Sequence, residues 1–197
     1  MSMITYTIEN RLYINVTNKC SNDCTFCIRA TEKGLGEEYD LWLKHEPSVD
    51  EILSEIKEPN KYDEIVFCGY GEPLLRYDVV IEVSKRLKEI SNVKLRINTN
   101  GQASFIFKTN IPKLLSPYID VISISLNAPN KERYNELCRP FDEDIYDGVI
   151  EFIKDSKKYI KEVWVSVLDI LDEKEIKECQ RIADELGVNF RIRRYEG

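Results

Sequence analysis

Residues 119–127 of the chain read Ile-Asp-Val-Ile-Ser-Ile-Ser-Leu-Asn, and this stretch decides the fold class. In an extended strand, successive side chains point to opposite faces. One face of this stretch is then apolar and the other mostly polar: Ile122, Ile124 and Leu126 against Val121, Ser123, Ser125 and Asn127. Residues 12–17 and 93–100 alternate in the same way. Fully buried parallel strands usually read as continuous apolar runs. We therefore expect the apolar faces to pack on helices and the polar faces to line a shared cavity.

Strand-like and helix-like runs alternate along the whole chain. Short runs rich in β-branched or aromatic residues occupy 12–17, 64–70, 93–99, 119–126, 162–168 and 188–194. Amphipathic stretches between them include 49–57, 77–90 and 173–186, with Ser48 placed to cap the first and Gly187 to end the last. The pattern predicts an α/β fold, a partial (βα)6 TIM-like barrel with parallel strands, because a complete TIM barrel needs eight such units. The interleaved helices disfavour the alternative, an antiparallel sheet with one face in water.

Length and charge narrow the class of protein. The chain has 197 residues, about one domain at ~150 residues per domain, and 1–197 contains no repeat or linker-like stretch. Its 28 Lys and Arg against 35 Asp and Glu give a net charge of −7, so we expect no general nucleic-acid partner. No window approaches ~20 consecutive apolar residues, and residues 1–10 lack the pattern of a signal peptide. We therefore expect a single-domain cytoplasmic protein without a membrane span.

Three of the six cysteines, Cys20, Cys24 and Cys27, lie in the loop 18–27 directly after the first predicted strand. Disulfides are rare in a cytoplasmic chain, so a close group of cysteines indicates a metal or redox site. The spacing also suits a buried helical face, but Ser21-Asn22-Asp23 favours a turn. A structural zinc site takes four ligands, and no fourth Cys or His lies nearby. Ferredoxin clusters also take four thiolates, whereas three leave one iron of a cubane open to a small molecule.

The spacing Cys20-x3-Cys24-x2-Cys27, with Phe26 before the last cysteine, resembles the signature of the radical S-adenosylmethionine (SAM) superfamily. Gly69-Tyr70-Gly71-Glu72-Pro73 follows the second predicted strand and resembles the Gly-Gly-Glu-Pro element that holds the methionine end of SAM, with Tyr70 in place of a glycine. The resemblance implies a [4Fe–4S] cluster on the three cysteines, with SAM chelating the open iron. It also implies SAM contacts in the cluster loop and the second motif, at Phe26, Gly69, Tyr70, Gly71 and Glu72, where the Glu72 carboxylate would hold the SAM ammonium.

Polar residues at later strand ends match the family more loosely. Asn98-Thr99-Asn100-Gly101 resembles the Thr-Asn-Gly element of small activating enzymes of the superfamily. Ser125-Leu126-Asn127 ends the fourth predicted strand, where the family often places ribose or carboxylate contacts. The resemblance thus implies SAM contacts at Asn98, Ser125 and Asn127, with capping of the strand ends as the alternative. Arg193 shares a face of the last strand with Arg191 near the expected adenine edge, and binding of an anionic substrate is its alternative.

The resemblance implies an oxidoreductase-type enzyme that reductively cleaves SAM to a 5′-deoxyadenosyl radical. This radical abstracts hydrogen from a substrate that is a peptide, a protein or a small metabolite. A one-electron donor of the flavodoxin or ferredoxin kind is the implied partner. Two alternatives stay open: an activating enzyme that makes a glycyl radical on a partner protein, and a non-catalytic iron–sulfur protein for electron transfer or sensing. The whole chain looks like the small radical SAM proteins called TatD-associated, so a TatD-type hydrolase is an expected genomic neighbour or partner.

Other segments carry weaker expectations. Residues 28–47 are longer than an ordinary βα loop, and we expect them to form a packed lid over the site, with an extra surface helix as the alternative. Cys68 falls in a predicted strand and Cys179 in a predicted helix, so we expect buried small side chains at both positions. Cys138 follows the fourth predicted strand, and from this placement alone we predict a catalytic role as hydrogen-atom donor or substrate tether.

Overall fold

The computed structural model describes residues 3–31, 34 and 39–195. Within them one sheet runs in chain order through β1 (Thr5–Ile8), β2 (Arg11–Ile14), β3 (Glu64–Phe67), β4 (Lys94–Thr99), β5 (Val121–Ser125), β6 (Glu162–Leu168) and β7 (Asn189–Arg193). Each neighbouring pair from β2 to β7 is parallel. The sheet is open, because its two end strands do not pair with each other. The predicted α/β class, the parallel strands and the partial barrel are therefore confirmed.

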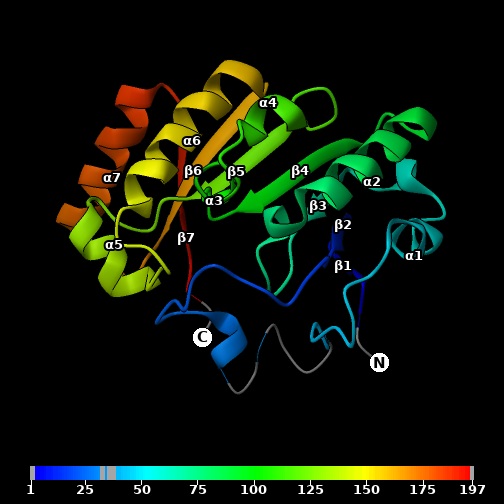
Figure 1. The fold of residues 1–197 in the computed structure, drawn as a ribbon, viewed down its shortest axis with the longest axis horizontal. Helices are drawn as coiled ribbons and strands as arrows, with labels where there is room; N and C mark the ends of the chain where they lie inside the picture. The colour runs from blue at the N-terminus through cyan, green and yellow to red at the C-terminus, as the bar shows by residue number, and fades with distance from the viewer. Residues whose placement is uncertain (1–2, 32–33, 35–38, 196–197) are drawn as a thin grey trace.

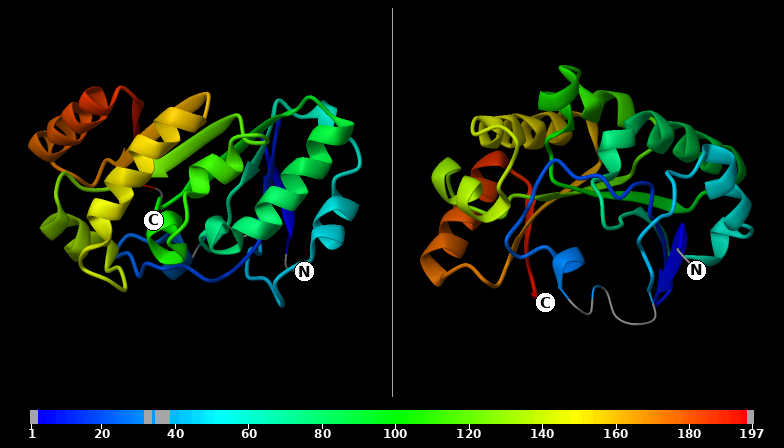
Figure 2. Two further views of the ribbon diagram at one scale, coloured as in Figure 1. Left: turned by 45° about the horizontal axis from the view of Figure 1, so that its top comes forward. Right: turned by 60° about the horizontal axis from the view of Figure 1, so that its bottom comes forward.

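Helices join the parallel strands and cover the outer face of the curved sheet, as Figures 1 and 2 show. They are α1 (Val49–Glu55), α2 (Tyr77–Ile90), α3 (Ala103–Phe107), α4 (Ile111–Leu115), α5 (Lys131–Cys138), α6 (Ile145–Tyr159) and α7 (Glu173–Leu186). Short 3-10 turns lie at Ile28–Ala30 (η1), Pro59–Lys61 (η2) and Pro73–Arg76 (η3). Ser48 caps α1 through a capping box with Glu51, and Gly187 ends α7 in the left-handed conformation with φ of 65°. Both caps expected from the sequence are confirmed.

The antiparallel strand β1 was not predicted, and it extends the sheet beyond the expected first strand. It pairs with β2 so that Tyr6 lies opposite Tyr13, with their rings stacked at 5.0 Å. The turn between the two strands places Glu9 at φ of 53°. Tight hairpin turns with positive φ usually carry Gly, Asn or Asp at that position. Glutamate occupies that position here, so the hairpin signal in the sequence is limited to Asn10, the second residue of the turn.

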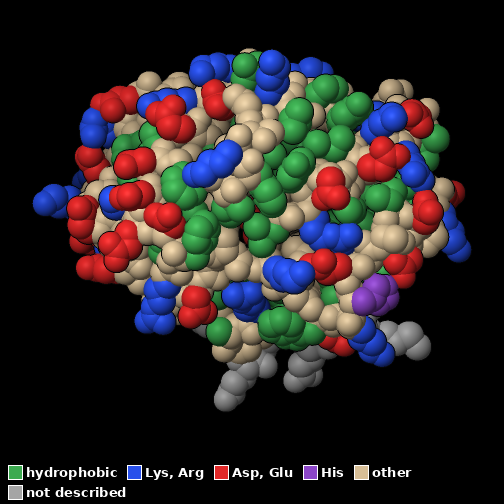
Figure 3. Space-filling view, in the orientation of Figure 1, with side chains coloured by type: hydrophobic (Ala, Val, Ile, Leu, Met, Phe, Trp, Pro, Cys, Tyr) green, Lys and Arg blue, Asp and Glu red, His purple; other side chains and the backbone are tan. Residues whose placement is uncertain are grey.

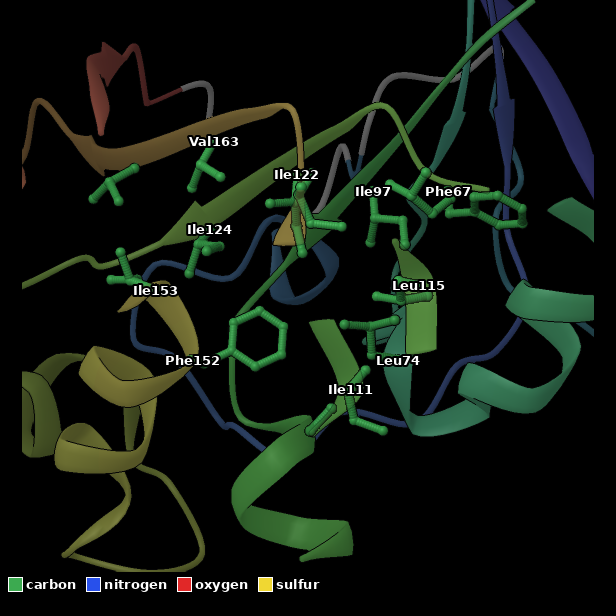
Figure 4. Packing of buried hydrophobic residues seen from close by; sticks show 14 of the residues in the cluster. Phe67, Leu74, Ile97, Ile111, Leu115, Ile122, Ile124, Phe152, Ile153 and Val163 are labelled. Atoms are coloured by element: carbon green, nitrogen blue, oxygen red, sulfur yellow. The ribbon is translucent and has the colours of Figure 1, made fainter. Parts of the chain in front are cut away.

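The hydrophobic core fills the space between the sheet and the helices. Figure 4 shows Phe67, Ile97 and Ile122 from the strands against Leu74 and Leu115, and all five are fully buried. Burying one such side chain contributes about 1.5–3 kcal/mol. The apolar face predicted for residues 119–127 lies in this core, so the opposite face is free to line a cavity.

The outer surface is of mixed charge. On the face shown in Figure 3, acidic and basic side chains are interspersed and form no continuous basic area. None of the helices in the described part of the chain has the length and apolar character that crossing a membrane requires. The functional features gather instead at one edge of the sheet. The loop 18–27 crosses the edge at which the parallel strands end, as Figure 1 shows.

Candidate functional site

A cavity of about 370 Å³ lies on the concave side of the sheet, at the carboxyl ends of the parallel strands. Every residue predicted to hold the cluster or to contact SAM lines this cavity: Cys20, Cys24, Phe26, Cys27, Gly69, Tyr70, Gly71, Glu72, Asn98, Ser125, Asn127 and Arg193. They come from the loop after β2, the loop after β3, strands β4, β5 and β7, and the segment just after β5. Cys138 is completely buried and is not among the described residues that line the cavity.

The loop after β3 packs closely against the cluster loop. The backbone N–H of Glu72 donates to the Lys19 carbonyl at 2.8 Å. A Cβ atom on Gly71 would lie 2.3 Å from the carbonyl oxygen of Thr17 and 2.5 Å from that of Lys19. Only glycine permits so close an approach of two backbones. A Cβ on Gly69 would likewise meet Asn15 Oδ1 at 2.1 Å. Both glycines of the second motif are therefore required for it to contact the segment that precedes the cysteines.

A buried polar network holds the middle of the cluster loop. Gln102, just after β4, donates from Nε2 to Asn22 Oδ1 at 2.7 Å and to the Tyr134 hydroxyl at 2.8 Å. The Ser21 hydroxyl donates to Gln102 Oε1 and accepts from Asn100 Nδ2 at 2.9 Å. Gln102 is completely buried and Asn22 nearly so. A buried network with its partners in place favours one conformation, so the loop backbone is fixed at residues 21 and 22.

The end of α5 holds the next part of the cluster loop. The backbone N–H of Asp23 donates to the Cys138 carbonyl at 3.1 Å, and that of Thr25 donates to the Leu137 carbonyl at 2.9 Å. The thiols of Cys24 and Cys138 share a hydrogen bond, and Asn127 Nδ2 donates to Cys138 Sγ at 3.6 Å. Cys138 thus lies behind Cys24 and not on the cavity surface. Its predicted part in hydrogen transfer stays a prediction.

The environment of Cys20 and Cys24 favours the protonated thiols in the absence of a metal. Burial, reinforced by the Glu72 carboxylate, raises the pKa of Cys20 to about 12. The hydrogen bond to Cys138, together with burial, raises the pKa of Cys24. Since thiolates are the metal ligands, cluster assembly must displace these thiol protons.

The arrangement of the three thiols bears on the kind of metal site they could form. No three ligating side chains in the described part of the chain stand close enough together to hold one metal ion. A zinc site needs all its ligands about 2.0–2.3 Å from a single atom, whereas a cluster takes each thiolate on a different iron. The three thiols line one cavity without converging on a point, so their arrangement disfavours a single zinc ion.

The Glu72 carboxylate joins the second motif to the end of β4. Its Oε1 accepts from Thr99 Oγ1 at 2.7 Å and from the Leu74 N–H at 3.0 Å, and its Oε2 accepts from the Asn100 N–H at 2.7 Å. The side chain is nearly buried, and desolvation raises its pKa to about 7 in spite of these three donors. Glu72 also lines the cavity, and its sequence-based role, binding of the SAM ammonium, stays a prediction.

The inner face of the sheet offers unpaired acceptors for a polar ligand. Asn98 Oδ1 and Asn127 Oδ1 are buried atoms without a hydrogen-bond partner. An unpaired buried acceptor costs about 1–3 kcal/mol, which a ligand donor such as an amine or hydroxyl would offset. Arg193 donates from Nε to Ser166 Oγ at 3.1 Å, and its Nη2 lies 3.5 Å from Ser125 Oγ. The donor and acceptor set at this edge therefore suits a ligand with amine, hydroxyl and carboxylate groups, as SAM has.

The segment 28–47 lies beside the cavity in the parts that the structure describes. Residues 32–33 and 35–38 of the predicted lid lie outside the described residues. Leu41 and Leu43 are buried, and the side chains of Asn15 and Asn18 donate to their carbonyls, each at 2.7 Å. Trp42 is 49% exposed and packs edge-on against the Tyr70 ring at 5.1 Å. Tyr70, which stands in place of a motif glycine, thus contacts this segment.

Sequence reasoning missed several residues of the cavity wall. Tyr6 belongs to the unpredicted strand β1, and Ser166 on β6 shares the inner face with the predicted Ser125. The period-2 pattern of residues 162–168 could have identified Ser166. Cys68 lines the cavity instead of being only a core residue, whereas Cys179 is completely buried in α7 as expected.

The fold and the cavity together define a class: open parallel-barrel proteins with a three-cysteine loop and a ligand cavity at the carboxyl edge of the sheet. Residues 14–186 match the family model described as the Radical SAM superfamily. This match spans most of the chain, and the chain belongs to the radical SAM superfamily. The [4Fe–4S] cluster and SAM are the cofactors of this family.

Known proteins of several activities are similar to the chain. It is 26% identical over 194 residues to the probable dual-specificity RNA methyltransferase RlmN 1 of Protochlamydia amoebophila, covering 88% of this chain and 49% of that protein. It is 27% identical over 172 residues to the probable GTP 3′,8-cyclase of Methanocaldococcus jannaschii, covering 86% and 54%. The chain therefore spans about half the length of these curated relatives. The fold is similar to that of Streptococcus suis SuiB bound to S-adenosylmethionine, with a TM-score of 0.69 and 20% identity over 95% of this chain and 41% of SuiB.

Proposed function

We propose that this chain is a radical SAM enzyme in which Cys20, Cys24 and Cys27 hold a [4Fe–4S] cluster. When bound and reduced, the cluster supplies the electron that cleaves SAM to methionine and a 5′-deoxyadenosyl radical, which removes a hydrogen atom from a substrate. The observation that carries the proposal is the single cavity shared by the three cysteines, the second motif and the inner-face polar residues.

The chain's own residues divide the binding of SAM between them. The half-buried backbone groups of Gly69 and Gly71, with the Glu72 carboxylate, take the methionine end beside the cluster loop. Asn98 and Asn127 present their unpaired oxygens to ligand donors. Ser125 on β5 and Arg193 on β7 lie on the inner face of the sheet and take the remaining polar groups of the nucleoside. Phe26 contributes an apolar wall next to the last cysteine.

The test is anaerobic reconstitution with iron and sulfide, followed by reduction in the presence of SAM and quantification of 5′-deoxyadenosine. Wild type should form a cluster and the nucleoside. Cys24→Ala should lose both. Cys179→Ala is the matched control, because Cys179 is a buried cysteine on α7 outside the cavity, and it should retain both. Failure of wild type to assemble any cluster, or equal behaviour of the two variants, would contradict the proposal.

Finer features belong to the same proposal. We place the chain among the TatD-associated radical SAM proteins, supported by the motif Gly69-Tyr70-Gly71-Glu72-Pro73 and the sequence around Cys138. A flavodoxin- or ferredoxin-like protein would deliver the electron, and a TatD-type hydrolase is a candidate partner that copurification would test. Residues 28–47 would act as a lid over SAM and substrate. Cys138→Ala tests the predicted hydrogen donor: product formation should fall while SAM cleavage persists.

A further inference from the structure

The concave face of the barrel carries a group of arginines below the carboxyl edge. Arg191 on β7 lines the site cavity and also a second cavity of about 250 Å³. Arg96 on β4 lines the second cavity. Ser123 lies between them on β5, lines both cavities and accepts from Arg191 Nη2 at 3.0 Å. The two cavities therefore adjoin at Arg191 and Ser123, so a molecule bound at Arg191 reaches the cavity assigned to SAM.

Protein carboxylates, Glu64 and Glu162, balance the positive charge at this place only in part. Arg96 Nη1 lies 3.2 Å from Glu64 Oε2, but the same carboxylate oxygen also lies 3.7 Å from Arg11 Nε. In the part of the chain that the structure describes, no carboxylate forms an ion pair with Arg191 or Arg193. The other charged residues of the second cavity, Lys94 and Glu162, pair with each other at 2.9 Å. The barrel interior thus holds more guanidinium groups than counter-charges.

Partial burial of Arg96, Arg191 and Arg193 makes this excess charge costly. Desolvation, followed by the repulsion of Arg96 and Arg193, lowers the pKa of Arg191. Desolvation also lowers the pKa of Arg193. Buried charges normally occur with a partner, because the interior screens charge poorly and solvates it weakly. An anion between the guanidinium groups would supply the missing partner.

The unpaired donors of these arginines point to the kind of ligand. Arg96 Nε and Arg191 Nε are both buried without a hydrogen-bond partner. A guanidinium group binds carboxylate or phosphate through parallel N–H donors, for which Nε is well placed. We propose that Arg191, together with Arg96 and Ser123, binds a carboxylate or phosphate group of the substrate inside the barrel. That the anion belongs to the substrate rests on the proposed function.

The carboxylate of SAM is not the anion in question. In the proposed function, SAM binds by its methionine end next to Cys20 and Glu72. Arg191 precedes Arg193 by two residues on β7 and so lies roughly 6–7 Å deeper, toward the amino ends of the strands. An anionic group at that depth would place the rest of the substrate between the arginines and the 5′-carbon of SAM.

The test is isothermal titration of cluster-loaded, SAM-bound protein with inorganic phosphate and separately with acetate, each against chloride at equal ionic strength. Wild type should bind one of the two probes saturably. Arg191→Gln should weaken that binding about tenfold or more, the effect of losing a charge-assisted contact. Arg191→Lys keeps the charge but not the planar guanidinium group. Its affinity for the probe should lie between those of wild type and Arg191→Gln. Arg86→Gln removes an exposed arginine on the outer helix α2 and should bind as wild type does.

Several outcomes would overturn the inference. One is that wild type binds neither probe saturably, and another is that Arg191→Gln binds the probe as tightly as wild type does. A third is that Arg191→Gln loses as much affinity for SAM as for the anion, because that result would assign the site to SAM. Cluster absorbance checks that each variant is folded and loaded. Because probe binding needs no reductant, its loss is distinguishable from failure of SAM cleavage. Phosphate binding without 5′-deoxyadenosine formation would leave the anion site standing and refute the proposed function.

Discussion

Replacement of Glu72 by glutamine should change how the stability of the metal-free protein depends on pH. Burial raises the pKa of Glu72 from 4.5 to about 7. The folded protein therefore binds this proton more tightly than the unfolded chain does. The contribution of Glu72 to stability is fully present below pH 4.5 and is lost as the pH rises through about 7. A glutamine side chain cannot ionise, so the Glu72→Gln variant should lack this loss.

The magnitude follows from the pKa values. A rise of the Glu72 pKa from 4.5 to about 7 corresponds to a change of about 3.4 kcal/mol in the free energy of unfolding over the whole pH range. Roughly 2–3 kcal/mol of this change falls between pH 5 and pH 8. The introduced glutamine retains one oxygen for Thr99 and Leu74 but turns its NH2 group toward the N–H of Asn100. Losing that acceptor costs about 1–2 kcal/mol. Glu72→Gln should thus be less stable than wild type at pH 5, and equal or more stable at pH 8.

Urea unfolding of metal-free wild type and variant at both pH values, with a chelator present, measures this difference. The stability of Glu72→Gln relative to wild type should rise by roughly 2–3 kcal/mol from pH 5 to pH 8. Glu58→Gln, at an exposed carboxylate in the segment before β3, is the matched control. A relative stability of Glu72→Gln that stays constant, or falls as the pH rises, would refute the link between burial and proton affinity.

Three further changes test the support of the cluster loop. Gly71→Ala places a Cβ 2.3 Å from the Thr17 carbonyl oxygen, so it should destabilise the protein by about 1–3 kcal/mol or more. The variant should also bind less iron after reconstitution. Normal iron content would contradict the close approach of the two backbones. Tyr134→Phe removes an acceptor of Gln102 and should cost about 1–2 kcal/mol in urea unfolding, whereas no cost would mean that the network is not maintained in solution. Ser48→Ala removes the cap of α1 and should cost about 1 kcal/mol in the same measurement without changing iron content, since α1 lies outside the site.

The parts of the fold that sequence predicts are those set by local patterns. Alternation with period 2 placed Ser123, Ser125 and Asn127 on one face, and all three line the cavity. The C-cap at Gly187 follows from its freedom to adopt positive φ. Strand β1 escaped prediction because Glu9 takes positive φ in its turn, a conformation that glutamate rarely adopts. The strand ends were also placed too late, since β2 stops at Ile14 and β3 at Phe67.

The contacts that shape the site depend on segments far apart in the sequence. Sequence reasoning assigned Glu72 to a ligand, whereas its carboxylate also joins the loop after β3 to Thr99 and Asn100. The contact of Cys24 with Cys138 spans more than a hundred residues and requires α5, a helix that was not predicted although Asn130 caps its start. The spacing of a motif identifies the residues that would bind the cluster and SAM. It does not identify the distant side chains that hold those residues in position.

The support of the cluster loop bears on how the cluster would form. Lys19 is held by Glu72, Asn22 by Gln102, and Asp23 by the end of α5, so three separate elements fix the backbone around the first two cysteines. Small metal domains such as zinc fingers fold only when the metal binds, because nothing else orders their ligands. Here the barrel orders the backbone of the cluster loop before any iron binds, so iron binding should change the backbone conformation little. Cluster assembly should therefore add little secondary structure, and circular dichroism of the metal-free and reconstituted protein in the far ultraviolet should nearly coincide.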